Sequence, residues 1–296
     1  MTITVDVLAR LYLLNATEPP APAVHDFVAA HGVVEAVNRI RGRTAPPAVL
    51  AEIVHPDATV DDDVSVIESG AARLVTPEGD DWPHHLLRGM AEHGLGVPLG
   101  LWLRGSARLT DLTCSAVTVV GCRAATDYGA FVAAELGVNL AHAGVTVVTG
   151  GAVGIETEAM RGAVVGEGPA IAVLPCGTDV AYPQSNGQLI SRVLDCGGLV
   201  VSEYPAGRTP ARSRHVARHR LVAALASTTV VVEAGARSGA LVTAHAACVL
   251  GRHVRGVPGP ITSWQSTGTN ELLRAGGAAA ITSTSVDDLL QSRGLR

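Results

Sequence analysis

Residues 116–154 read AVTVVGCRAATDYGAFVAAELGVNLAHAGVTVVTGGAVG, and this stretch decides the fold class. It begins with a short β-branched apolar run, Ala116–Val120, and continues through a helical stretch from about Asp127 to Ala143. A second apolar run, Val145–Thr149, and a glycine-rich turn complete it. A strand, a crossover helix and a second strand make up the repeating unit of parallel sheets. The sequence therefore predicts an α/β domain.

The same alternation continues toward the C-terminus. Further apolar runs are expected to form strands at Ala170–Leu174, Leu199–Glu203, Thr228–Glu233, His253–Val257 and Ala278–Ile281. Because these runs are apolar on both faces and most are separated by helical stretches, we predict a doubly wound, mostly parallel sheet covered by helices on both sides. Ligands of such sheets bind outside the carboxyl ends of the strands, so the turns there are candidate binding segments.

The first hundred residues have a different pattern. Helical spacing of apolar residues is found at Val5–Leu14 and His25–Arg41, and the acidic run Asp61–Asp63 is expected to begin another short helix. We predict a small all-helical domain at residues 1–72, a linking segment at 73–113 that leads into the sheet, and the α/β domain at 114–296.

The charge of the chain is unevenly distributed. All 22 basic residues of the 296-residue chain are arginines, and the net charge is −5. Residues 1–113 hold 8 Arg and 15 acidic residues, a net charge of −7, whereas residues 114–296 hold 14 Arg and 12 acidic residues, a net charge of +2. The overall negative charge therefore does not exclude a nucleic-acid partner for the C-terminal part.

Composition and spacing exclude several classes of enzyme. Without lysine the chain has no P-loop motif and no Schiff-base nucleophile. Its eleven histidines and five cysteines lack the spacing of metal ligands, and neither a membrane span nor a signal peptide is recognisable. Glu156 and Glu158 open a predicted helix, where a structural role is expected. We expect a cytoplasmic protein with reduced cysteines, no cofactor and no metal.

The turns after the predicted strands are suited to binding phosphates. Most contain glycines, which let backbone amides approach a ligand closely, and several lead directly into helix N-termini. Tyr204–Arg220, which we expect to form a long loop after the fourth strand, carries five arginines and no acidic residue. Five arginines exceed the need of a mononucleotide, so the backbone of a polynucleotide is the expected ligand.

The motifs, taken in order, resemble the DprA/Smf family of DNA-processing proteins. The matching segments are Val119–Thr126, Thr149–Ile155, Arg161–Ala163, Cys176–Pro183 with Asn186, Val201–Pro205, Glu233–Ala244, Gly256–Pro260 and Asn270–Leu273, together with Trp82-Pro83 and Leu101–Gly105. The resemblance extends from about residue 73 to residue 290. Residues 1–70 are similar in kind to the sterile-alpha-motif-like domain of the family.

The resemblance implies an extended Rossmann-like domain that binds single-stranded DNA, forms a homodimer, helps to load a RecA-type recombinase and catalyses no reaction. It implies that Arg123, Arg218 and Arg220 contact DNA. Together with the turns at the strand ends, the candidate DNA-binding residues are Gly121, Arg123, Gly150, Gly151, Gly154, Gly177, Asp179, Arg212, Arg214, His215, Arg218, His219, Arg220, Arg237, Ser238 and Gly239.

The chain departs from the family pattern at several positions. His215 stands where the family usually has phenylalanine and His219 where it has asparagine, while Glu156 and Met160 replace the usual aspartate and histidine. We also expect that the winged-helix C-terminal domain of many members is absent. Two alternatives stay open: a nucleotide-binding enzyme or sensor related to lysine-decarboxylase-like phosphoribohydrolases, and a purely structural relative with a decayed site. Against hydrolysis, the turn that begins at Glu233 is followed by a helix without an acidic residue.

Overall fold

The computed structural model describes residues 3–290 and divides the chain into two compact units. The first unit consists of the described part of Met1–Arg104 with Pro175–Val180 and Val201–Ala217. The second consists of Gly105–Leu174, Ala181–Val200 and the described part of Arg218–Arg296. The predicted domain boundaries at residues 72 and 113 stay predictions, and the end of the third predicted domain, 291–296, lies outside the described residues.

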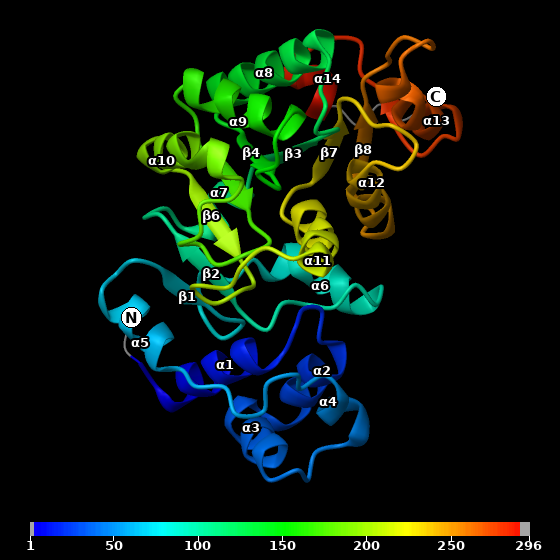
Figure 1. The fold of residues 1–296 in the computed structure, drawn as a ribbon. Helices are drawn as coiled ribbons and strands as arrows, with labels where there is room; N and C mark the ends of the chain where they lie inside the picture. Colours follow the sequence, from blue (N-terminus) through cyan, green and yellow to red (C-terminus); the bar gives the residue numbers. More distant parts are fainter. Residues whose placement is uncertain (1–2, 291–296) are drawn as a thin grey trace. The chain divides into compact units, whose positions relative to one another are not determined.

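The first unit contains six helices and two strands in its described N-terminal part (Figure 1). These are α1 (Val5–Ala16), α2 (Pro22–His31), α3 (Val33–Arg41), α4 (Pro47–Ala51), α5 (Asp61–Glu68), β1 (Arg73–Val75), α6 (His84–Glu92) and β2 (Leu101–Arg104). The expected helices near the N-terminus are thus present, but the second is divided in two at Gly32, which ends α2 by donating its backbone N–H to the carbonyl of Val28 at 2.8 Å.

One apolar core holds this unit together. Leu11, Leu13 and Tyr12 of α1 are buried with Val37 of α3 and with Trp102 of β2. The strands β1 and β2 pair antiparallel. Each such buried aliphatic or aromatic side chain contributes about 1.5–3 kcal/mol relative to an exposed one, so the helices and the pair of strands are stabilised mainly by mutual burial.

Asp63 is an acidic residue buried in this unit. Its carboxylate accepts a hydrogen bond from the Asn15 side-chain amide, yet burial raises its pKa from 3.8 to about 6. The folded state therefore binds the Asp63 proton more tightly than the unfolded state does, and the free energy of unfolding falls as the pH rises from about 4 through 6.

We expect Asp63→Asn to raise the free energy of unfolding at pH 7 by about 1–2 kcal/mol and to remove most of this pH dependence. Urea denaturation at pH 4.5 and pH 7 measures both effects. Asp57→Asn, at an exposed position of the same unit, serves as the control. A less stable Asp63→Asn variant at pH 7 would contradict the assignment.

The second unit is built on a parallel sheet. Its elements are α7 (Leu109–Thr113), β3 (Ala116–Val120), α8 (Asp127–His142), β4 (Thr146–Thr149), α9 (Ile155–Val165), β5 (Ala170–Val173), the 3-10 turn η1 (Gln184–Asn186), α10 (Gly187–Asp195), β7 (Thr228–Val231), α12 (Gly239–Val249), β8 (His253–Gly256), the 3-10 turn η2 (Trp264–Ser266), α13 (Thr267–Arg274), β9 (Ala279–Ala280) and α14 (Val286–Leu290). Residues of β6 (Leu199–Ser202) and α11 (Arg212–Ala224) belong to both units.

Within the second unit the strands lie in the order β5-β4-β3-β7-β8-β9. The neighbouring pairs are parallel; Val120 lies opposite Val231, for example, in the pairing of β3 with β7. The chain moves away from β3 in one direction through β4 and β5, and in the other through β7 and β8. This reversal makes the carboxyl ends of β3 and β7 the topological switch point, where ligands of doubly wound sheets bind.

Helices cover both faces of this sheet. α8 and α9 lie side by side against β3 and β4 (green in Figure 1), whereas α12 packs on β7 and β8. Right-handed crossovers in opposite directions from the switch point place these two sets of helices on opposite faces. The predicted doubly wound, mostly parallel α/β fold is confirmed, and each expected strand begins and ends within two residues of the observed one.

One prediction about this region is wrong. Residues Arg212–Arg220 of the arginine-rich run were expected to lie in a long loop, but they form the first part of α11. Arginine, alanine and leucine are strong helix formers, and their propensity here is supported by the burial of Leu221 and Val222 in the same helix.

Among the described residues, the helices also lack a segment long and apolar enough to cross a membrane.

Candidate nucleic-acid interface

The turn after β3 presents an exposed arginine on a fixed backbone. Arg123 is exposed, while its neighbour Cys122 is buried and donates its backbone N–H to the carbonyl of Glu233 at 2.7 Å. The carbonyl of Cys122 in turn accepts from the backbone N–H of Ile155 at 3.3 Å. Since the turns after β3, β4 and β7 are joined by these bonds, the position of the Arg123 backbone is set by both neighbouring strands.

Glu233, two residues after the end of β7, holds the start of α8. Its buried carboxylate accepts hydrogen bonds from the backbone N–H and the hydroxyl of Thr126 at 3.0 and 2.5 Å, and Thr126 is the N-cap of α8. Burial and the nearby Glu233 carboxylate raise the pKa of the Cys122 thiol to about 11. Glu233 therefore has a structural task and Cys122 stays a neutral thiol, an arrangement that does not favour the phosphoribohydrolase-like alternative.

The glycine turn after β4 rests on a buried arginine. Arg218 is 4% exposed, and its Nη1 donates hydrogen bonds to the carbonyl of Gly150 and to that of Val173, the latter at 3.3 Å. On the other side of the turn, the carboxylate of buried Glu156 accepts from the backbone N–H of Ala152 at 2.9 Å. The structural role expected for Glu156 is thereby supported by its geometry.

Gly150 lies between these two charged groups. A Cβ atom at this position would be 2.8 Å from the Arg218 Cζ and 3.0 Å from a Glu156 carboxylate oxygen. Asn186 reaches the same turn, because its side-chain amide donates to the carbonyl of Gly151 at 3.1 Å and to the Thr157 hydroxyl at 2.8 Å. The sequence pattern does not assign this role to Asn186, although the residue belongs to a segment that resembles the family.

The turn after β7 carries a second exposed arginine. Arg237 is exposed, and Ser238 caps α12 by accepting a hydrogen bond from the backbone N–H of Ala240 at 3.3 Å. The half-buried His219 imidazole contacts the Thr243 hydroxyl through Nδ1 at 2.8 Å and lies against Gly239. His219 therefore packs on α12 within the second unit.

Two candidate residues of the first unit belong to a compact turn. The Asp179 carboxylate accepts from the backbone N–H of Gly207 with both oxygens at 3.0 Å, and Gly177 donates its backbone N–H to the carbonyl of Arg208 at 2.9 Å. Arg208 donates from its guanidinium to the carbonyl of Asn15 at 3.0 Å. Asp179 thus stabilises a turn, as its Gly-Thr-Asp context indicates.

Arg214 is bound within the first unit. Its guanidinium forms an ion pair with Glu18, donates to the carbonyl of Thr209 at 2.6 Å and lies 5.0 Å from the centre of the Tyr204 ring. His215 is half-buried, and Arg212 is exposed at the start of α11.

The arginine-rich run is consequently much less basic at the surface than its sequence indicates. Arg218 and Arg220 are 4% and 6% exposed, and Arg208 and Arg214 are half-buried with partners. Within this fully described run, Arg212 is the exposed arginine. The second unit thus holds Gly121, Arg123, Gly150, Gly151, Gly154, Arg218, His219, Arg220, Arg237, Ser238 and Gly239, and the first unit holds Gly177, Asp179, Arg212, Arg214 and His215.

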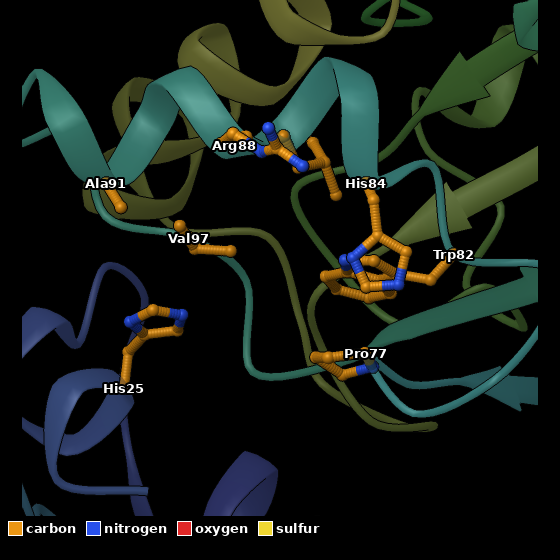
Figure 2. Close-up of a pocket in the computed structure, with 8 residues that line it drawn as sticks. His25, Pro77, Trp82, His84, Arg88, Ala91 and Val97 are labelled. Atoms are coloured by element: carbon orange, nitrogen blue, oxygen red, sulfur yellow. The ribbon is translucent and has the colours of Figure 1, made fainter. Parts of the chain in front are cut away.

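A separate cavity of about 220 Å³ lies in the first unit. Figure 2 shows His84 and Arg88 of α6 beside Trp82, with His25 of α2 facing them across the cavity. The cavity contains none of the candidate DNA-binding residues, and no sequence motif indicates it.

In residues 3–290, no three His, Cys, Asp or Glu side chains gather in a way that could hold a metal ion.

Comparison with known proteins identifies the family. A family model described as DNA recombination-mediator protein A matches residues 73–294. The chain belongs to this family. Over 300 residues it is 42% identical to a putative DNA processing protein DprA of Mycobacterium tuberculosis, a match that covers 97% of this chain and 75% of the relative. The resemblance to the DprA/Smf family is therefore confirmed.

Two solved structures of DprA proteins are similar to this chain. The X-ray structure of DprA from Streptococcus pneumoniae matches with a TM-score of 0.76 and 29% identity over 97% of both chains. DprA from Helicobacter pylori, whose structure concerns its single-stranded DNA binding mode, matches with a TM-score of 0.61 and 28% identity over 72% of this chain and 92% of that one. The extended Rossmann-like fold is shared with these DNA processing proteins.

Proposed function

We propose that this protein binds single-stranded DNA, without a chemical reaction, at the turns that follow its parallel strands. The observation that carries the proposal is the placement of two exposed arginines, Arg123 and Arg237, in the turns that follow the adjacent parallel strands β3 and β7. Guanidinium groups at a switch point rich in glycine turns are suited to successive phosphates of one strand. The single-stranded DNA binding of the Helicobacter pylori relative supports the same ligand.

The proposal extends to the biological role. As a member of a family of recombination mediators, the protein is proposed to act in the cytoplasm as a homodimer that protects incoming single strands and passes them to a RecA-type recombinase. Recombinase filament assembly on a strand coated with this protein, compared with assembly on a strand coated with the Arg123→Ala variant, tests the transfer. Sedimentation tests the dimer.

The salt dependence of binding is expected to reflect the exposed arginines only. Each phosphate neutralised on a single strand contributes a slope of about −0.7 in a plot of log K against log salt. Arg123 and Arg237 predict a slope of about −1.4, whereas five surface arginines in the run Tyr204–Arg220 would alone give about −3.5. Fluorescence anisotropy with a labelled single-stranded oligonucleotide at several salt concentrations measures this slope.

Arg123→Ala is expected to weaken binding to all sequences alike and to make the slope shallower by about 0.7. Arg161→Ala is the matched control, because Arg161 is exposed on α9 and paired with Glu158 at 2.7 Å. Affinity that is independent of salt, or equal effects of the two substitutions, would refute backbone contacts by Arg123. Release of ribose phosphate from a nucleoside monophosphate would refute the non-catalytic function.

A further inference from the structure

Trp264 is an exposed tryptophan that neither the fold nor the candidate interface requires. The chain has three tryptophans, all within the described residues, and Trp82 and Trp102 are 4% and 1% exposed. Trp264, in η2 between β8 and α13, is 60% exposed. Exposing so large an apolar ring is unfavourable, and large exposed aromatic side chains commonly mark binding surfaces.

The Trp264 ring packs against the backbone of the turn after β7. A Cβ atom on Gly235 would be 3.2 and 3.3 Å from two atoms of the six-membered ring, so the indole lies directly against this glycine. The same segment is anchored by the backbone N–H of Gly268, which donates to the carbonyl of Ala234 at 2.7 Å, and by the Thr267 hydroxyl, which donates to the carbonyl of Trp264 at 2.8 Å. The position of the largely exposed ring is thus set before a ligand binds.

The turn that supports Trp264 also carries the exposed Arg237. Gly235, which supports the ring, accepts a hydrogen bond from the backbone N–H of Ser238 at 3.0 Å, so Arg237 belongs to the same four-residue turn. That turn begins two residues after Glu233, whose carbonyl holds Cys122 beside Arg123. Ile261, before Trp264, is 93% exposed. An aromatic face beside a guanidinium at a strand end is the combination with which proteins bind single strands.

We infer that the exposed face of Trp264 is a stacking platform for a base of the single strand whose phosphates bind at Arg237 and Arg123. This inference deepens the proposed function and rests on it. It adds a contact to the base that is independent of sequence, because every base has a π-face. A second copy of the chain is the competing occupant of this face, and the neighbouring cations favour the polyanion.

Two substitutions and one altered strand test the platform. Trp264→Ala is expected to weaken binding to an oligothymidylate about tenfold, and Trp264→Phe, which keeps an aromatic face, no more than about threefold. A strand of the same length with abasic sites carries the same phosphates but no bases. We expect Trp264→Ala to change the affinity for this abasic strand by less than about twofold, because only the base contact is lost. Phe131→Ala, at another exposed aromatic residue of the second unit, is the control and should leave both affinities unchanged.

Tryptophan fluorescence provides a direct signal, because Trp264 is the exposed tryptophan. The oligothymidylate is expected to quench the emission of the unaltered protein, and the quenching should disappear in Trp264→Phe while anisotropy still reports binding. Quenching that persists in Trp264→Phe would assign the DNA contact to the cavity at Trp82. An emission shift with protein concentration in the absence of DNA would assign the exposed surface of Trp264 to contact with a second copy of the chain. Equal loss of affinity for the abasic strand would make the role of Trp264 structural. Each of these three contrary results overturns the inference about Trp264 and leaves the proposed function intact. Absence of any DNA binding by anisotropy overturns both the inference and the proposed function.

Discussion

Replacing Arg218 by alanine is expected to lower the free energy of unfolding by about 3 kcal/mol. The guanidinium is buried in the second unit and donates to the carbonyls of Gly150 and Val173. The substitution removes the donor and leaves both carbonyls and the neighbouring Glu156 carboxylate in a cavity of the missing side chain. The resemblance to the family implies a DNA contact for Arg218, which stays a prediction, and in this structure its guanidinium supports the glycine turn.

Arg212→Ala is the matched control for this prediction. Arg212 lies on the same helix, α11, and is exposed, so its loss should change the free energy of unfolding by less than about 0.5 kcal/mol. Urea denaturation followed by circular dichroism compares the two variants. Unfolding of Arg218→Ala at the same urea concentration as the unaltered protein would refute the supporting role.

The second large effect is expected for Gly154→Ala, which should lower the free energy of unfolding by about 3–4 kcal/mol. Gly154 has φ +85° and ψ −133°, a region that residues with a side chain almost never adopt. A Cβ atom there would be 2.4 Å from the Arg123 carbonyl oxygen and 2.5 Å from that of Cys122. The added methyl group therefore strains its own backbone and pushes away the turn that presents Arg123.

Gly144→Ala separates these two contributions. Gly144, which follows α8, also has a positive φ of +67°, but a Cβ atom would meet nothing within 4 Å. Its substitution is expected to cost only about 1 kcal/mol, from the backbone strain alone. Thermal or urea unfolding of both variants measures the difference, and DNA affinity should fall for Gly154→Ala and stay constant for Gly144→Ala. Equal destabilisation of the two variants would show that the contact with the Arg123 turn is unimportant.

Much of the α/β fold could be predicted because its signals are local. Ala116–Val120 was predicted as a strand with the observed ends, and the helix expected from Asp127 ends one residue earlier than predicted. A fully buried parallel strand must be apolar on both faces and a crossover helix must follow it, so short stretches of sequence carry this information. The glycine turns at the strand ends follow from the same pattern.

The surface charge of the candidate interface could not be predicted in this way. Arg214 and its partner Glu18 are 196 residues apart in the sequence, and Arg218 and Gly150 are 68 apart. The sequence around Trp264 likewise does not indicate whether this tryptophan is exposed or buried in the core. The exposure of each of these side chains depends on which distant backbone or carboxylate it meets.

The sequence alone determined the sheet, its switch point and the position of the turns in this protein. The information lies in Ala116–Gly154 and in the alternation of strands and helices that continues after it. Only the tertiary structure decided which arginines remain at the surface: Arg123 and Arg237 are exposed, whereas Arg218 supports a turn and Arg214 pairs with Glu18. The physical reason is that secondary structure follows from hydrophobic periodicity along the chain, while the burial of a charged side chain depends on partners that only folding brings near.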